Sequence, residues 1–329
     1  MANWFKRGAG KDVAAKAEKP ELTSRERVLR EYRLDAERFM KYSIPAEEGE
    51  GPRSVEGYQA LQGMNLDATT IRHAHKVEKG LALPAPKRPF GRSLPNRALS
   101  AVLGRDDLPD EAFYLEEARI ALASLQQWND GGDLADVSAP RGDSLPTNPL
   151  DAETLAHFLT SRHSVRNFEP RTMDRELVTE AVRLAAYAPS VCNRQAWRIY
   201  YFDDPTEIAT VLALHSGSAG FADNVPGLFL ITYDIGSFER SMERNQGWID
   251  GGLYSMNLML ALHGLGFGSV PLNWSRKNWA SKKMRALVGI PENENIVMLI
   301  GAGHPAEGYR VARSARRPLE QILKFGLQK

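Results

Sequence analysis

Residues 161–166, Ser161-Arg162-His163-Ser164-Val165-Arg166, hold the densest group of side chains that could do chemistry. They supply two guanidinium groups, an imidazole and a serine hydroxyl directly after a predicted helix. A guanidinium group can bind a phosphate through two parallel hydrogen bonds, and a hydroxyl adds a further donor. The segment therefore favours an anionic ligand over the plain alternative, which is the solvated end of a helix.

Two further polar segments lie downstream. The loop Ala188-Pro189-Ser190-Val191-Cys192-Asn193-Arg194-Gln195-Ala196-Trp197 carries hydroxyl and amide groups, which suit the heteroatom edge of a planar ring or a phosphate. Arg313, Arg316 and Arg317 form a second basic cluster near the C-terminus. Two basic clusters so far apart, in a chain of balanced charge, predict one phosphate that is held from two sides.

The glycine-rich run Gly264-Leu-Gly-Phe-Gly268 is spaced somewhat like a dinucleotide-binding fingerprint. That fingerprint must follow a strand and open a helix, because the helix N-terminus holds the pyrophosphate. Here the glycines follow a predicted helix and precede a predicted strand, so we interpret them as a helix C-cap and turn. The chain also has no Gly-x-x-x-x-Gly-Lys-Ser/Thr run, which excludes a P-loop.

Two weaker candidates are a metal site at His73, His75 and Glu78 and a nucleophile at Cys192. We favour a partly exposed helix face for the first group. For Cys192 no partner base is evident, so we favour a small buried residue. We therefore predict no metal site and assign no catalytic side chain. A single cysteine cannot form an internal disulfide, which points to a reducing compartment.

The elements that position these groups follow from hydrophobic spacing. Thr23 to Glu26 is a capping box that opens a helix, Asp67 would cap a second helix to about Lys79, and Asp110 would open a third. Residues 130–149, rich in Gly, Pro, Ser and Asp, form the clearest linker. Asn148-Pro149 then places a cap before a proline at the first position of a new helix.

After the linker the pattern mixes strands with helices, which predicts an α+β fold. The predicted strands are residues 197–202, 227–233, 268–272 and 295–300, and a helix beginning at Asp174 precedes the first. Further helices are predicted at 205–215, 246–263 and 276–288. The most apolar window, around residues 249–270, contains Asp250 and several glycines, so it reads as a buried helix and not as a membrane span.

Composition bounds the remaining possibilities. The 329 residues carry a net charge of +1, with 43% hydrophobic and 25% charged residues, as in an ordinary globular protein. Because neither half of the chain is strongly basic, binding to nucleic acid is not expected. The N-terminus has no apolar signal region, and no membrane association is expected. We expect a cytoplasmic enzyme with a disordered tail at residues 1–20.

Taken together, these segments resemble the FMN-dependent nitroreductase family, in the right order over residues 150–323. The matching motifs are Arg162-His163-Ser164-x-Arg166, Pro189-Ser190-x-x-Asn193-x-Gln195-x-Trp197, Asp250-Gly251-Gly252-x4-Asn257-Leu258, Gly264-Leu265-Gly266, Gly303-His304-Pro305 and Arg316-Arg317-Pro318. Each motif alone is weak, but their combination is specific. The resemblance implies a nitroreductase-like fold, with a central mixed or antiparallel sheet flanked by helices and a long buried helix at a dimer interface. The implied domains are a mostly helical N-terminal region at 21–147 and an FMN-binding domain at 148–329.

The same resemblance implies a cofactor site shared by two subunits of a homodimer. Residues 162–166 would bind the phosphate, ribityl chain and ring of FMN, and Arg316 would hold the phosphate. The loop from Pro189 to Gln195 would reach the FMN of the partner subunit. The implied contacts are Arg162, His163, Ser164, Arg166, Pro189, Ser190, Asn193, Gln195, Pro271, Leu272, Asn273, Arg316 and Arg317, the residues at 271–273 lying beside the flavin ring.

Two positions depart from the family pattern. Asn273-Trp274 stands where the family often has an acidic residue and a glycine, and Ser314 stands where it has a lysine, so that Arg313 or Arg317 would take that role. The implied function is an oxidoreductase in which NAD(P)H reduces FMN and an electron-poor small molecule takes the electrons. The alternatives are a flavin-binding accessory protein without NAD(P)H turnover, or a relative that performs dehalogenation, enone reduction or flavin breakdown.

Overall fold

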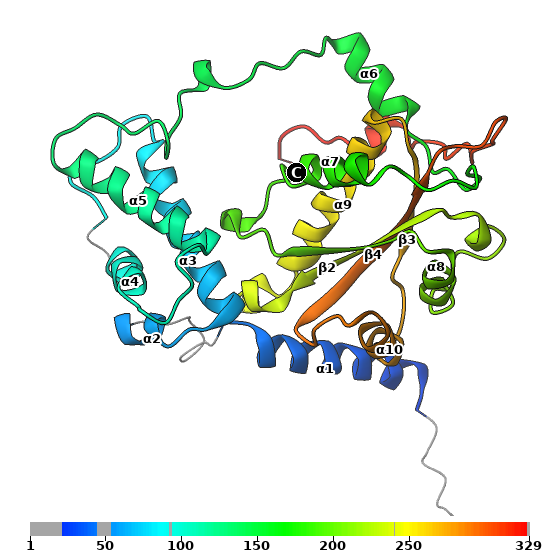
Figure 1. Cartoon of the computed structure of the whole chain (residues 1–329), viewed down its shortest axis with the longest axis horizontal. Helices are drawn as coiled ribbons and strands as arrows, with labels where there is room; N and C mark the ends of the chain where they lie inside the picture. Colours follow the sequence, from blue (N-terminus) through cyan, green and yellow to red (C-terminus); the bar gives the residue numbers. More distant parts are fainter. Residues whose placement is uncertain (1–21, 45–53, 92–93, 240, 328–329) are drawn as a thin grey trace, which may run out of the picture.

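The computed structural model describes residues 22–44, 54–91, 94–239 and 241–327. Its centre is one antiparallel sheet of four strands in the order β1-β2-β4-β3 (Figure 1). The strands are β1 (Trp197–Phe202), β2 (Gly227–Asp234), β3 (Gly268–Asn273) and β4 (Glu294–Gly303). This arrangement confirms the predicted α+β class, and β1 and β3 form the two edges.

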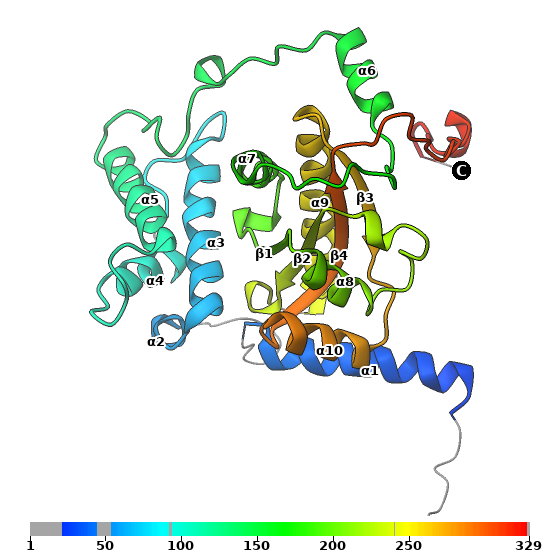
Figure 2. The ribbon, with the colours of Figure 1, turned by 45° about the vertical axis from the view of Figure 1, so that its right-hand side comes forward.

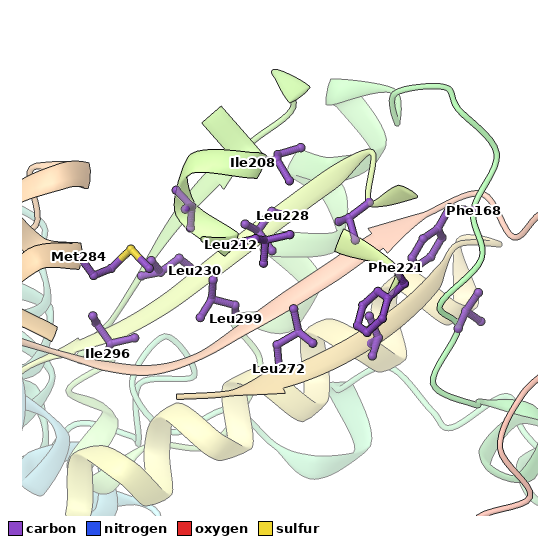
Figure 3. Close-up of a cluster of buried hydrophobic side chains, with 14 of the residues drawn as sticks. Phe168, Ile208, Leu212, Phe221, Leu228, Leu230, Leu272, Met284, Ile296 and Leu299 are labelled. Atoms are coloured by element: carbon purple, nitrogen blue, oxygen red, sulfur yellow. The ribbon is translucent and has the colours of Figure 1, made fainter. Parts of the chain in front are cut away.

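The alternation of side chains along β2 divides the core into two layers. Leu228 and Leu230 lie in the layer with α8 (Pro205–Leu212) and α10 (Asn278–Val288), which Figure 3 shows. Phe229 and Ile231 lie on the opposite face with α7 (Arg175–Ala185) and α9 (Gln246–Gly264). Burial of each of these side chains contributes about 1.5–3 kcal/mol, so both faces of the sheet are stabilised by helices.

The predicted elements of this part of the chain agree closely with the observed ones. Asp174 caps α7, and α9 ends at a C-cap followed by Gly266 with a positive φ of 85°. The glycine run is therefore a helix end, as its position before a strand predicted. Among the described helices, none is both long and apolar enough to cross a bilayer.

The N-terminal region is helical and packs beside the sheet. Its helices are α1 (Ser24–Tyr42), α2 (Val55–Gln59), α3 (Gly63–Leu81), α4 (Leu94–Leu103) and α5 (Phe113–Asn129). Thr23 and Glu26 form the predicted capping box at α1. In Figures 1 and 2, α2–α5 lie to one side of the sheet and α1 runs along α10. The predicted tail at residues 1–20 lies outside the described residues.

Three predicted helix starts were wrong. Asp67 lies inside α3, because packing around the buried Leu66 extends that helix to a cap at Gln62. The cap of α5 is Ala112, and the carbonyl of Asp110 instead accepts a hydrogen bond from Arg119.

The third error concerns α6 (Ala152–Ser161), which begins after Asp151 and not after Asn148. The Asn148 Oδ1 accepts the Leu150 N–H at 3.0 Å, a local turn that keeps Pro149 outside the helix. The Asp151 carboxylate accepts the Thr154 N–H at 2.7 Å and is the true cap. The linker before it crosses from α5 to α6 with one short 3-10 turn, Gly142–Ser144 (Figure 1).

Candidate functional site

The segment 162–166 lies directly beside edge strand β3. Ser164 forms a parallel bridge with Ser269, and the Val165 N–H donates to the Ser269 carbonyl at 3.0 Å. This close approach requires Gly268, since a Cβ there would lie 2.9 Å from the Cβ of Val165. In this parallel register Arg162 and His163 lie opposite residues 267–268, and Pro271, Leu272 and Asn273 lie farther along β3, on the side of Arg166.

The charge in this segment has few internal partners. The Nη1 atom of Arg162 is buried and finds no hydrogen-bond partner among the described residues. Burial, and then the charge of Arg162, lower the pKa of His263, whose Nε2 lies 2.9 Å from the Ser161 hydroxyl. Arg166 is exposed, with its guanidinium 5.9 Å from the centre of the Phe221 ring. A half-buried guanidinium group with an unused buried donor is suited to an anionic or oxygen-rich ligand.

On β3 the three predicted residues differ in what they can offer. Pro271 and Asn273 are exposed, whereas Leu272 is buried in the core layer with α8 and α10. The Asn273 carbonyl lies 3.1 Å from His215 Nε2, and the Asn273 side chain donates to Ser275 Oγ at 3.1 Å. Leu272 can therefore contact a ligand only through its backbone.

The loop at 189–195 has an unusual backbone held by local bonds. Cys192, Asn193 and Gln195 adopt positive φ angles of 50°, 55° and 48°. The Ser190 hydroxyl accepts the Gln195 N–H at 3.1 Å, and Asp250 accepts the Val191 N–H at 3.1 Å. Non-glycine residues in this region cost of order 1–3 kcal/mol each and persist where the surroundings enforce them.

The side chains on this loop are partly available. Pro189 and Asn193 are exposed, and Ser190 and Gln195 are half-buried. The Gln195 amide donates to the Asn193 carbonyl at 3.3 Å. Cys192 is half-buried, so the prediction of a buried cysteine was wrong. The residue lies in a left-handed turn of the loop and not in the core.

Two residues that hold the loop were missed as positioning groups. The Arg194 side chain is fully buried, donates twice to the Glu243 carboxylate at 2.6 and 2.9 Å, and also donates to the Ser237 carbonyl. Burial alone would raise the pKa of Glu243, but the bonds from Arg194 outweigh it and lower that pKa. Asp250, whose pKa burial raises, was quoted as part of a motif and given no role.

Within one chain the loop and the segment 162–166 lie far apart. The loop precedes β1 and contacts α9 at Asp250, whereas the segment pairs with β3 and Ser161 contacts α9 at His263. These α9 positions are separated by about 20 Å, given a rise of about 1.5 Å per residue. One subunit therefore does not bring these two groups of predicted residues together.

The C-terminal arginines also stand apart. Arg316 and Arg317 are exposed, with Arg316 donating to the Ser314 carbonyl and Arg317 to Gln321 Oε1 at 3.3 Å. Figures 1 and 2 show the C-terminal segment leaving β4 and passing near the lower end of α6. The guanidinium groups of Arg316 and Arg317 therefore lie at the surface.

The weaker metal candidate has a structural account. His75 Nδ1 lies 2.8 Å from Glu78, but His73 is buried and burial lowers its pKa to about 2. The expected exposed helix face was therefore wrong for His73, which packs against Tyr58. Across the described part of the chain, no cluster of three or more His, Cys, Asp or Glu residues could hold a metal.

Comparison with known proteins identifies the domain that carries the site. The sequence model of the nitroreductase family matches residues 159–220 and 213–304. Residues 159–304 thus match the nitroreductase family. The match includes the segment 162–166, the loop 189–195 and β3, and it ends before Arg316. It confirms the family prediction and leaves the N-terminal helices α1–α5 outside the matched residues.

Individual relatives cover the same part of the chain. A Thermus thermophilus protein named NADH dehydrogenase is 28% identical over 208 residues, which span 53% of this chain and 95% of that protein. Iodotyrosine deiodinase from Nematostella vectensis is 24% identical over 221 residues, which span 57% of this chain and 81% of that protein. Among solved structures, an FMN-dependent nitroreductase from Clostridium difficile R20291 aligns with a TM-score of 0.45 and 21% identity over 52% of this chain and 99% of its own.

Proposed function

We propose that this nitroreductase-family oxidoreductase binds FMN and passes electrons from NAD(P)H to an electron-poor small molecule. The observation that carries the proposal is the buried Arg162 Nη1, which has no partner among the described residues and lies in the segment beside β3. An FMN oxygen would satisfy this donor. FMN supplies the reversible uptake and release of electrons when bound, while the protein binds and orients it.

The residues fit such a group in distinct roles. Arg162 and Arg166 would neutralise the phosphate, with Arg316 and Arg317 approaching from the C-terminal segment. His163 and Ser164 would bind the ribityl chain and ring edge, and Pro271, Leu272 and Asn273 would border the ring through backbone and exposed atoms. We assign no side chain as an obligatory acid, since solvent or substrate can supply the proton.

We further propose that the protein acts as a homodimer with two shared sites. Helix α9 exposes an apolar stripe, with Trp248, Ile249, Leu253 and Met256 each at least 40% exposed. Helix α6 has no buried residue in the described chain, although it carries Leu155 and Leu159. Twofold packing along α9 would bring the N-terminal part of one helix toward the C-terminal part of the other. The loop 189–195 of one subunit would then approach the segment 162–166 of its partner.

Colour and reduction test the cofactor directly. Purified protein should be yellow, and NADH or NADPH should bleach it in the absence of oxygen. Yellow protein that neither nucleotide reduces would favour the accessory role, and colourless protein that never takes up FMN would overturn the flavin proposal.

Mixing two defective variants tests the shared site. In a heterodimer of Arg162→Ala and Asn193→Ala subunits, one site would carry both changes and the other neither. Random exchange should therefore restore up to about half of one normal FMN site per chain pair, or about a quarter of all sites. The control is each variant exchanged with itself. If both residues served the flavin of one subunit, every site would keep one change and no recovery would appear.

Reductive dehalogenation is the second candidate, and it is favoured by the similarity to iodotyrosine deiodinase from Nematostella vectensis. The reduced protein should be offered nitroaromatics, quinones and halogenated phenols under one set of conditions. Fast halide release with slow nitro reduction would select dehalogenation, and the reverse order would select the nitroreductase activity.

A further inference from the structure

A cavity of about 810 Å³ lies between α1 and α10, away from the proposed flavin site. Figures 1 and 2 show the two helices running side by side at the edge of the domain. Its walls include Leu34 and Tyr42 from α1, with Lys277, Trp279, Lys282 and Arg285 from or just before α10. Since α1 lies outside the residues that the nitroreductase family model matches, the cavity is formed with an element added to that domain.

The walls of this cavity are strongly basic. Seven of the lining residues are Lys or Arg and three are Glu. One of the three, Glu31, is engaged, because its carboxylate accepts the Asn278 N–H at 2.8 Å and the Asn278 side-chain amide at 3.0 Å. Basic side chains therefore outnumber acidic ones among the described lining residues, which favours an anionic occupant.

Arg285 is the strongest sign of a missing ligand. Its side chain is 4% exposed, yet Nε and Nη1 form no hydrogen bond with any described residue. Its nearest acidic group is the Glu292 carboxylate, 3.6 Å from Nε. Two of its guanidinium nitrogens are therefore buried without a hydrogen-bond acceptor in the described part of the chain, and a buried donor without an acceptor loses the hydrogen bond that it had in water. An anion in the cavity would supply those acceptors.

Arg38 adds a second guanidinium to the same wall. It donates to Asn295 Oδ1 and to the carbonyls of Glu292 and Glu294, which are neutral acceptors and leave its charge uncompensated by these bonds. Burial and the neighbouring Arg285 lower the pKa of Arg38. A smaller cavity of about 390 Å³ is also lined by Arg38 and Arg285, so both residues border space on two sides. Two guanidinium groups at one cavity are suited to a phosphate or diphosphate.

The remaining wall suits an aromatic body. Trp279 is 53% exposed and lines the cavity together with Tyr42 and Leu34. A planar ring can stack on such a surface, and covering an exposed tryptophan removes apolar surface from water, which is favourable. We propose that the α1–α10 cavity binds a phosphorylated aromatic small molecule of the nucleoside diphosphate class, with phosphates at Arg38 and Arg285 and the ring at Trp279. This site is independent of the flavin proposal.

Calorimetric titration of the flavin-loaded full chain with ADP tests the assignment. ADP should bind saturably to the wild type. The double variant Lys277→Glu/Lys282→Glu, which reverses the charge of two exposed lining residues, should bind ADP at least tenfold more weakly. Lys79→Glu/Lys87→Glu is the matched control, because it makes the same change of charge at exposed positions outside the cavity, and it should leave the affinity unchanged. Flavin absorbance should be identical in all these proteins.

Trp279→Ala separates the aromatic contact from the charge. It should weaken ADP binding and leave the binding of inorganic phosphate unchanged. Equal affinity for ADP and phosphate in the wild type would overturn the aromatic part of the proposal. No saturable ADP binding, or equal binding in wild type and the double lysine variant, would overturn the site itself. Thermal melting of each variant confirms that it is folded.

Discussion

Replacing Arg194 with methionine should show how much the buried ion pair beneath the loop 189–195 contributes to the free energy of unfolding. Methionine keeps much of the apolar stem but removes the charge that pairs with Glu243 at 2.6 and 2.9 Å. Glu243 would then be left without its bidentate partner, and Ser237 would lose a donor to its carbonyl. Breaking one side of a buried ion pair costs about 3–5 kcal/mol.

The expected loss of stability lies near the lower end of that range, at about 3 kcal/mol. Glu243 keeps 23% of its side chain exposed, so water replaces part of the lost interaction. The charge of Arg72 also remains nearby and helps to lower the pKa of Glu243. The matched control is Arg183→Met, which removes an arginine with the same bidentate geometry toward Glu180, at 2.6 and 2.7 Å, but at an exposed position. Exposed pairs contribute little, so this variant should unfold like the wild type.

Urea unfolding of the apoproteins, followed by circular dichroism, measures both free energies without the stabilisation that bound FMN would add. FMN titration of the same proteins shows whether the loop 189–195 keeps its conformation. If Cys192, Asn193 or Gln195 relaxes from its left-handed conformation, affinity should fall by about tenfold, which corresponds to about 1.4 kcal/mol. Equal unfolding free energies for Arg194→Met and Arg183→Met would refute the reasoning, because the two pairs differ mainly in burial.

Three further predictions test other parts of the chain. Arg162→Ala should lower FMN affinity by about ten- to a hundredfold. Arg316→Ala should lower it less, since Arg313 and Arg317 lie close to Arg316 in sequence and can compensate for its charge. Fluorescence titration measures both affinities, and equal losses would contradict the prediction. Deletion of residues 1–60 should leave FMN bound but lower thermal stability, because the truncation removes the Arg38 contacts with β4 and keeps α3; a folded truncation without flavin would contradict this. Burial lowers the pKa of His73 to about 2, so below pH 6.5 the unfolded chain binds a proton that the folded chain does not. The free energy of unfolding should therefore fall as the pH drops below 6.5, by up to about 1.4 kcal/mol per pH unit. His73→Phe should flatten this fall in urea unfolding between pH 6.5 and 4.5, and identical slopes in both proteins would contradict it.

Local patterns in the sequence were sufficient to predict many elements. The strand Trp197–Phe202 was predicted with its observed bounds, and the caps at Thr23 and Asp174 were confirmed. In each case the deciding interactions lie within a few residues, as in the Thr23–Glu26 capping box. The continuous apolar run at residues 227–233 likewise predicted a strand, and the structure covers both faces of β2 with helices.

Distant partners explain most of what the sequence did not predict. Arg194 lies among polar residues, and its burial depends on Ser237 and Glu243, which are more than forty residues away. The start of α3 depends on packing with α2 and α4, and α4 itself was not predicted. The left-handed angles of Cys192 and Gln195 also have no local signature, because neither residue is a glycine or an asparagine.

The contacts of α3 give the N-terminal region a role beyond covering the domain. Arg72 on α3 forms a buried ion pair with Glu239, and the Glu239 N–H donates to the Glu243 carboxylate at 2.8 Å. Glu243 in turn holds Arg194 in the loop, so an unbroken polar chain joins α3 to the left-handed turn. Removing α1 would leave this chain intact, whereas a change at Arg72 would act on the loop from a helix outside the residues that the family model matches. The two parts of the N-terminal region therefore contact different sites. Helix α3 is linked to the loop 189–195 of the proposed flavin site, and α1 lines the basic cavity beside α10.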